Sequence, residues 1–155
     1  QNQPWVDTVL ILIYSGWRIS ELLNLKPEDI DLQAGTMKGG TKTKAGKDRV
    51  VPIHSKIRPL VEARLAEGGP RLISYNGRVC NQTQYRVFWA DIMKALDMKH
   101  TPHECRHTFE TQLDSAGANR KCIDLLMGHV SKDTGNRVYN HKTLDELKAA
   151  VELVE

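Results

Sequence analysis

The sequence has few cysteines and lacks a long apolar segment. Cys80, Cys105 and Cys122 are odd in number and show no paired spacing, which argues against a disulfide framework and suits a reducing compartment. The longest apolar run, residues 9–14, is far shorter than the ~20 residues that cross a bilayer. The N-terminus shows no charged region or cleavage pattern typical of a secretion signal. We therefore expect a cytoplasmic protein with no membrane association.

Length and charge indicate one domain with a basic region. The 155 residues are enough to bury one apolar core, so we expect a single domain over residues 1–155. The net charge of +3 is small, but residues 38–64 hold eight basic and two acidic residues. The basic ones are Lys38, Lys42, Lys44, Lys47, Arg49, Lys56, Arg58 and Arg64. Such a segment is typical of proteins that bind polyanions, although a merely solvated face would also carry it.

Hydrophobic periodicity predicts a mainly helical α+β domain. Glycine stops, a proline breaker and apolar spacing predict helices near residues 4–14, 18–25, 55–67, 81–97, 102–116, 119–127 and 143–154. Ser55 and Thr143 are expected to be N-caps. Within residues 30–53, short strand-like segments are separated by glycine-containing turns. This pattern predicts one small antiparallel sheet with a hairpin tip near residues 44–47.

Residues 100–117 concentrate side chains that can do chemistry. Thr101, Pro102 and Glu104 form a capping box, which predicts that this stretch is a helix. On that helix His103, Arg106 and His107 would share one face and Cys105 would point elsewhere. The guanidinium fork of Arg106 suits a phosphate or carboxylate and would sit badly beside a metal ion. A metal-dependent hydrolase that uses His103 and His107 remains an alternative.

Four separated blocks together resemble the tyrosine recombinase, or phage integrase, family. They are Arg18 with Glu21, Lys42 with Thr43, His103 with Arg106 and His107, and Gly128-His129 followed by Tyr139 and His141. The stretches 14–32 and 42–54 resemble the integrases of phages and conjugative elements in particular. Three positions depart from the usual pattern without touching a residue of chemical role: Trp17 replaces a commoner Leu or Met, Cys105 a Leu, and Glu110 an Ala.

The resemblance implies metal-independent and cofactor-independent cleavage of DNA. Arg18 and Arg106 would bind the non-bridging oxygens of the scissile phosphate, and His103 and His129 would add hydrogen bonds there. Tyr139 would be the nucleophile that forms a 3′-phosphotyrosine, with His103 accepting its proton.

The basic hairpin would supply the proton for the leaving 5′ oxygen. The family takes it from a hairpin lysine, which corresponds to Lys42, while Lys44 stays an alternative. Lys44, Lys47 and Arg49 are expected to bind DNA. His107 and Glu21 would support the site without touching the substrate.

The resemblance also implies partners and a domain organisation. Residues 1–155 correspond to the catalytic domain, without the core-binding and arm-binding domains that usually precede it. We expect integration or excision of a phage or bacterial mobile element on nucleoid DNA, by a homo-tetramer. Dimer resolution and relaxation of the type IB topoisomerase kind share this chemistry and stay open. The last helix would either pack on its own domain or dock on a neighbouring protomer. A DNA-binding module of the same ancestry that has lost catalysis is the other open function.

Overall fold

The computed structural model describes residues 4–40, 48–129 and 141–155, with the side chains of 141–143 left aside. Its helices are α1 (Val6–Ile13), α2 (Ile19–Asn24), α3 (Arg58–Glu67), α4 (Gln82–Ala95), α5 (Pro102–Ser115), α6 (Arg120–Met127) and α7 (His141–Glu152), with a 3-10 turn η1 (Pro27–Asp29). The strands are β1 (Ile30–Asp31), β2 (Thr36–Gly39), β3 (Arg49–Pro52), β4 (Ser74–Tyr75) and β5 (Arg78–Val79). The predicted mainly helical α+β class is confirmed.

The turn between α1 and α2 lies directly against α5. Helix α1 is apolar along most of its length and buries Ile11 and Leu12 completely. Gly16 then adopts a φ of +73°, and a Cβ at this position would run into the ring of Phe109 on α5. Glycine therefore permits both the left-handed turn and the close approach, which together bring the residue after next, Arg18, towards α5.

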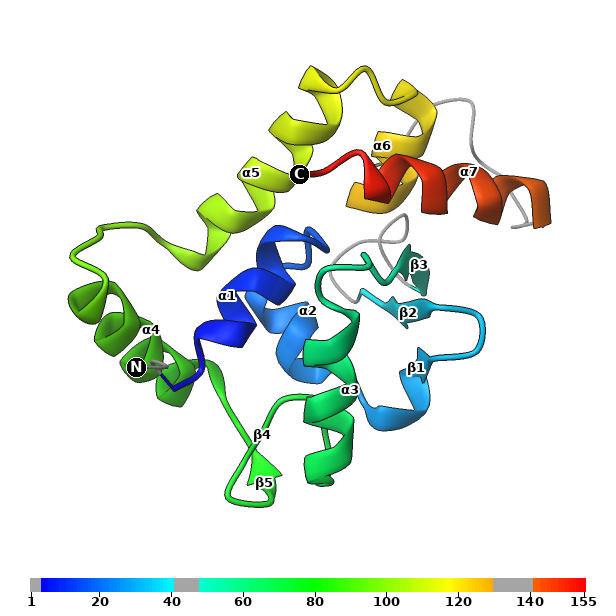
Figure 1. The fold of residues 1–155 in the computed structure, drawn as a ribbon. Helices are drawn as coiled ribbons and strands as arrows, with labels where there is room; N and C mark the ends of the chain where they lie inside the picture. The colour runs from blue at the N-terminus through cyan, green and yellow to red at the C-terminus, as the bar shows by residue number, and fades with distance from the viewer. Residues whose placement is uncertain (1–3, 41–47, 130–140) are drawn as a thin grey trace.

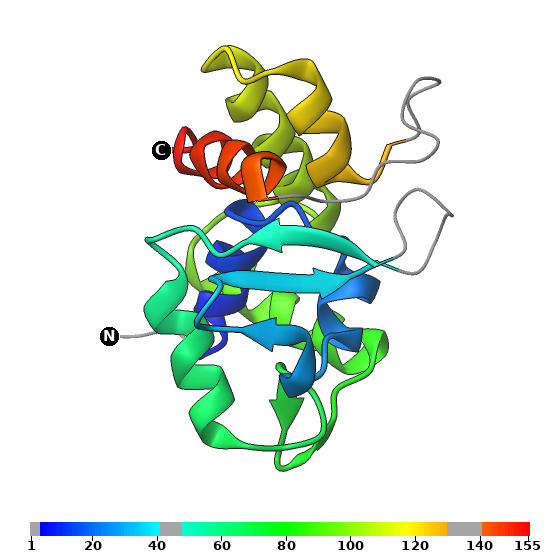
Figure 2. The same ribbon diagram turned by 90° about the vertical axis from the view of Figure 1, so that its right-hand side faces the viewer.

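The predicted sheet over residues 30–53 is confirmed as three antiparallel strands in the order β1-β2-β3. Met37 pairs with Val51, and both are fully buried, while the adjacent Lys38 is exposed on the opposite face. Figure 2 shows α1 and α2 behind this sheet, and α2 contacts β2. The alternation of buried and exposed residues thus fixes which face of the sheet meets the helices.

A second, two-stranded sheet corrects the expectation of a single one. Strands β4 and β5 pair antiparallel around Asn76 and Gly77, which have φ values of 51° and 73°. Two consecutive positive φ values define the tight turn that Asn-Gly favours. The sequence signal was therefore present, but two-residue strands are too short to show a period.

Two predicted N-caps are wrong although their helices are present. Helix α3 begins at Arg58, and Ser55 instead donates from its N–H and hydroxyl to the carboxylate of Glu152, at 2.7 and 2.8 Å. Helix α7 begins at His141, so Thr143 lies inside it.

Helix α7 packs on the domain that carries it. Leu147, Val151 and Val154 are buried, and α7 contacts β3 and α6 (Figure 1). Its end is held by a hydrogen bond between His54 Nε2 and the Val154 carbonyl, at 2.7 Å, and by Tyr14 Oη donating to the Glu155 carbonyl at 2.8 Å. The cis arrangement is therefore the one that this structure contains.

Candidate active site

Arg18 is the residue before α2, and its position is fixed by the first turn of that helix. Its backbone N–H donates to Glu21 Oε1 at 2.9 Å, and its guanidinium Nη1 lies 3.5 Å from Glu21 Oε2. The side chain is 22% exposed, which leaves part of the guanidinium accessible to a ligand. Glu21 thus holds Arg18, as the family resemblance implied, by accepting the Arg18 N–H at the start of α2.

Arg49, predicted to bind DNA, is instead a buried residue in this structure. It is 1% exposed and donates to both carboxylate oxygens of Glu21, at 2.7 and 2.8 Å. Its Nε donates to the Leu126 carbonyl at 3.0 Å, and its guanidinium lies 4.5 Å from the centroid of the Trp17 ring. In this structure the Arg49 guanidinium is therefore held by a carboxylate, a carbonyl and an indole ring of the protein.

The charge of Glu21 is stabilised by these arginines. Burial alone would raise the pKa of this carboxyl, but the hydrogen bonds and charge of Arg49, together with the contacts from Arg18, lower its pKa below the ordinary value. Glu21 is therefore an anion at neutral pH, although it is 1% exposed.

Arg106 turns inward from α5 and joins the turn after α1 to the end of α6. Its Nη1 donates to the Gly16 carbonyl and its Nη2 to the Met127 carbonyl, each at 2.6 Å. It is 3% exposed, so its orientation is fixed by the protein. Since Met127 is the last residue of α6, Arg106 also satisfies a carbonyl at the negative end of that helix.

The surroundings of Arg106 hold an excess of positive charge. Burial, followed by the charges of Arg18 and Arg49, lowers the pKa of Arg106 to about 10, against smaller opposing effects of Glu21 and Glu110. The residue stays protonated at neutral pH. An anion placed beside Arg18 and Arg106 would relieve this repulsion.

The two histidines of α5 lie at the surface. His103 and His107 are exposed, whereas Arg106 between them is buried, so the predicted shared face lies at the edge of the core. His103 lines a mainly apolar pocket of about 410 Å³ together with Ile19, Tyr85 and Trp89. Among the side chains of residues 4–40, 48–129 and 144–155, no three of His, Cys, Asp and Glu gather as metal ligands.

Cys105 is part of the core. It therefore points away from the exposed His103 and His107, as the helical spacing predicted. It is 6% exposed, and burial together with the charge of Glu104 raises the pKa of its thiol to about 12. A thiol of this kind does not ionise near neutral pH and is a poor nucleophile or metal ligand.

His129 follows the left-handed Gly128 that ends α6, and it faces two carboxylates. Its Nδ1 lies 3.8 Å from Glu110 Oε2 and 4.0 Å from Asp124 Oδ1. Arg120 Nη2 lies 3.5 and 3.2 Å from the same two oxygens. No sequence motif placed these carboxylates beside His129, although Glu110 departs from the usual family pattern.

Several predicted site residues lie outside the described residues. They are Lys42, Lys44, Lys47 and Tyr139. The first three belong to the connection between β2 and β3, and Tyr139 lies between His129 and the start of α7. Their roles stay predictions.

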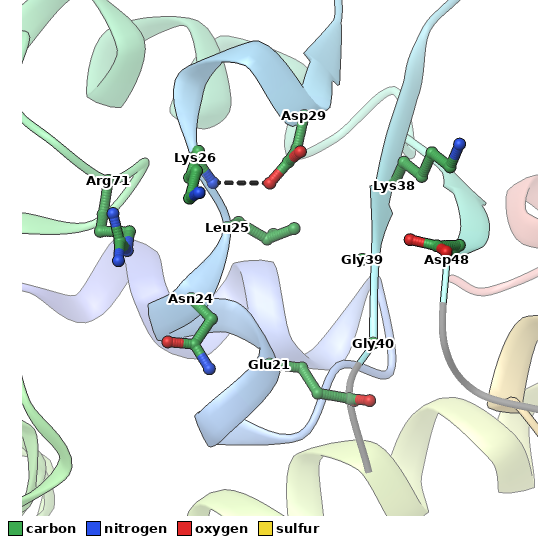
Figure 3. Close-up of a pocket in the computed structure, with 10 residues that line it drawn as sticks. All are labelled: Glu21, Asn24, Leu25, Lys26, Asp29, Lys38, Gly39, Gly40, Asp48 and Arg71. Atoms are coloured by element: carbon green, nitrogen blue, oxygen red, sulfur yellow. Dashed lines mark hydrogen bonds between the residues drawn. The ribbon is translucent and has the colours of Figure 1, made fainter. Parts of the chain in front are cut away.

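A second pocket of about 400 Å³ lies beside the base of the hairpin (Figure 3). It is lined by Glu21, Asn24, Leu25, Lys26, Asp29, Lys38, Gly39, Gly40, Asp48 and Arg71. In Figure 3 the Lys26 N–H donates to Asp29, at 2.9 Å, on one side, while Lys38 stands on β2 and Asp48 directly precedes β3. Three carboxylates balance three cations here, so the anion site is better assigned to the arginine cluster.

Known proteins share both the sequence pattern and the fold. The phage integrase family model matches residues 6–146. The chain is 36% identical over 154 residues to tyrosine recombinase XerA of Thermococcus kodakarensis, covering 93% of this chain and 53% of that protein. It therefore spans about half the length of the curated relatives it matches. Among its described residues, none of the helices has the length and apolar character to cross a membrane.

Solved structures agree with this assignment. The crystal structure of XerA recombinase matches with a TM-score of 0.71 at 26% identity, covering 96% of this chain and 58% of that one. The integrase of transposon Tn1549, solved in complex with circular intermediate DNA, has a TM-score of 0.69 at 23% identity over 90% of this chain and 52% of its own. The second likeness concerns the fold. The family resemblance of the sequence is thus confirmed, and the chain belongs to the phage integrase family.

Proposed function

We propose that this chain is the catalytic domain of a site-specific DNA recombinase that cuts and rejoins DNA through a 3′-phosphotyrosine. The observation that carries the proposal is the arginine cluster: Arg18 and Arg106 are held in place by protein acceptors and repel each other. A scissile phosphate is the anion that would fit between them. Donors fixed before the reaction stabilise developing negative charge most effectively.

The chemistry follows from the residues assigned by family membership. The Tyr139 hydroxyl attacks phosphorus and forms a phosphotyrosine bond, while the bond from phosphorus to the 5′ oxygen breaks. His103 accepts the tyrosine proton, and Lys42 protonates the leaving oxygen, with Lys44 as the other candidate. Since an unperturbed tyrosine has a pKa near ~10, the cationic cluster would also favour its ionised form.

His129 would complete the contacts to the phosphate. Its Nδ1 faces Glu110 and Asp124, so its Nε2 is the nitrogen available for a substrate oxygen. Lys47 would contact the DNA backbone outside the cleavage point.

The proposed partners are double-stranded DNA and further copies of the chain. The Tn1549 integrase structure contains DNA, and we extend that partner to this chain on the strength of the shared fold and the arginine cluster. We propose a tetramer on DNA in which α7 leaves its cis position and docks on a neighbouring protomer. Its buried stripe of Leu147, Val151 and Val154 would supply the contact in either arrangement.

Residues 1–155 would form one catalytic domain of a larger recombinase that acts on nucleoid DNA in the cytoplasm. The biological reaction that we propose is integration or excision of a mobile element. Core-binding and arm-binding domains outside this chain would supply most of the affinity for the attachment site.

A nicked suicide substrate tests the proposal. When the nick releases the short 5′ fragment, the reverse reaction is lost and a covalent protein–DNA adduct accumulates. We expect an adduct with wild-type protein, in the form that its gene encodes, and none with Tyr139→Phe. Specific binding without an adduct under any condition would support the non-catalytic module instead. Loss of cleavage in chelator, with stoichiometric bound metal, would support the metal-dependent hydrolase.

A further inference from the structure

Arg49 connects three parts of the candidate site from the protein interior. It is the first residue of β3, immediately after the connection that contains the hairpin lysines. From there it binds both oxygens of Glu21 on α2 and the carbonyl of Leu126 in the last turn of α6. Because it is 1% exposed, every one of these contacts is internal.

Glu21 passes this connection on to Arg18. Its Oε1 accepts the Arg18 N–H at 2.9 Å and Arg49 Nη2 at 2.8 Å, while its Oε2 lies 2.7 Å from Arg49 Nη1 and 3.5 Å from Arg18 Nη1. The carboxylate cannot rotate to follow Arg18 without breaking its two bonds to Arg49. The position of Arg18 therefore depends on Arg49.

The same guanidinium also holds the end of α6. Arg49 and Arg106 bind the carbonyls of Leu126 and Met127, the last two residues of that helix. Gly128 and His129 follow directly. Arg49 thus fixes the Leu126 carbonyl, which is next to the Met127 carbonyl that Arg106 binds. Both lie just before the chain continues to His129.

We propose that Arg49 is a positioning residue for phosphate binding, acting through Glu21 on Arg18 and through the Leu126 carbonyl on the end of α6. The inference rests on the proposed function for its catalytic consequence. A lysine could not take this role, because one ammonium cannot span both Glu21 oxygens and the Leu126 carbonyl in one plane. Trp17 completes the enclosure at 4.5 Å, at a position where the family more often has Leu or Met.

The molecule contains a matched control for the test. We name Arg49–Glu21 the site pair and Arg64–Asp7 the α1–α3 pair. Arg64 binds both Asp7 oxygens at 2.6 and 2.8 Å and lies 4.5 Å from the Trp5 ring centroid. Removing one partner alone would leave a buried charge and could unfold the protein, so each pair is replaced as a whole. The variants are Arg49→Met with Glu21→Gln, and Arg64→Met with Asp7→Asn.

The first readout is the rate of adduct formation on the suicide substrate. We expect a loss of about 100-fold for the site-pair variant, as for a misplaced reacting group, and little change for the α1–α3 variant. Combining Arg18→Ala with the site-pair change should lose less activity than the product of the two separate losses, because both changes act in part through Arg18. A substrate with a methylphosphonate at the cleavage point carries one negative oxygen fewer than the phosphate. On that substrate the losses in rate of the site-pair variant and of Arg18→Ala should both be smaller. Multiplicative losses, or equal losses from both pairs, would overturn the inference.

The second readout does not depend on cleavage. In isotope-labelled protein, the guanidinium NMR signals of Arg18 should show restricted rotation in wild type and in the α1–α3 variant, and averaging in the site-pair variant. Unchanged Arg18 signals in the site-pair variant would overturn the inference, whatever the activity. A wild-type protein that forms no adduct would contradict the proposed function, and the NMR comparison would still decide the role of Arg49.

Discussion

Two buried arginine–carboxylate pairs in this domain have almost the same geometry and different surroundings. In the site pair Arg49 binds Glu21 at 2.7 and 2.8 Å, and in the α1–α3 pair Arg64 binds Asp7 at 2.6 and 2.8 Å. Each guanidinium also lies 4.5 Å from the centre of an indole ring. Pair geometry alone therefore does not separate a functional arrangement from a structural one.

The surroundings do separate them. The α1–α3 pair lies near further negative charge: burial alone would lower the pKa of Arg64, but Asp7 and then Glu67 raise it. The site pair lies among cations, and burial with the charges of Arg18 and Arg49 lowers the pKa of Arg106 to about 10. One pair is balanced by the protein, while the other leaves positive charge for a ligand to balance.

Single substitutions should separate the pairs by stability. Arg49→Met leaves Glu21 charged at 1% exposure, so we expect it to lower the free energy of unfolding by about 3–5 kcal/mol. Arg64→Met leaves Asp7 at 23% exposure, where water can solvate it, and should cost about 1–3 kcal/mol. Urea unfolding of the two variants measures both. Equal losses would mean that the site pair is no more enclosed than its counterpart.

Arg18→Ala should lower cleavage without lowering stability. It removes one donor to the phosphate, for which a loss of about 10²–10³-fold in the rate of adduct formation is typical. It also removes a charge that repels Arg106, so the melting temperature should stay level or rise. Adduct kinetics and thermal melting, run on the same preparation, check both parts. A destabilised variant with unchanged cleavage would contradict the assignment of Arg18 as a phosphate ligand.

Acid should weaken the site pair. Because the pKa of Glu21 is lowered in the fold, its contribution to stability is present above the unfolded-state value of ~4.3 and is lost as the pH falls through the folded value. Below about pH 4 the wild type should lose on the order of 1 kcal/mol more than the Arg49→Met, Glu21→Gln variant. The comparison needs the free energies of unfolding of both proteins, measured from pH 6 downwards in steps of about one pH unit. Parallel curves for the two proteins would show that Glu21 does not carry the linkage.

Inorganic phosphate should stabilise the folded protein slightly. A ligand present at a few times its Kd adds about 1 kcal/mol, which corresponds to about 2–4 °C in Tm for a domain of this size. The shift should disappear in Arg18→Ala and persist in the Arg64→Met, Asp7→Asn variant. Chloride at matched ionic strength is the control for screening. A shift that survives in Arg18→Ala would place the phosphate elsewhere.

The sequence predicted the elements better than the burial of their charges. Glycine stops and a capping box placed α1, α5 and α6, because such signals act within one turn of the chain. The spacing of His103, Arg106 and His107 gave a common helix face but could not show that Arg106 turns inward. That direction depends on the carbonyls of Gly16 and Met127, which lie far from Arg106 in sequence.

Arg49 shows the same limit more sharply. In the sequence it is one more cation in a basic hairpin, and its neighbours give no sign of burial. Its partners, Glu21 and Leu126, lie 28 and 77 residues away. Charge and local pattern indicated a polyanion-binding segment, and only tertiary contact distinguishes the residue that supports the site from those at the surface.

The most direct test of the account is the chemical identity of the protein–DNA bond. After reaction with a suicide substrate, trypsin should release the peptide of residues 138–142 with nucleotide attached, and mass spectrometry should locate the phosphate on Tyr139. We expect this adduct in wild type and in the Arg64→Met, Asp7→Asn variant, and far less of it in the Arg49→Met, Glu21→Gln variant. A phosphate on any other residue, or no adduct under conditions of saturated DNA binding, would contradict the proposed mechanism.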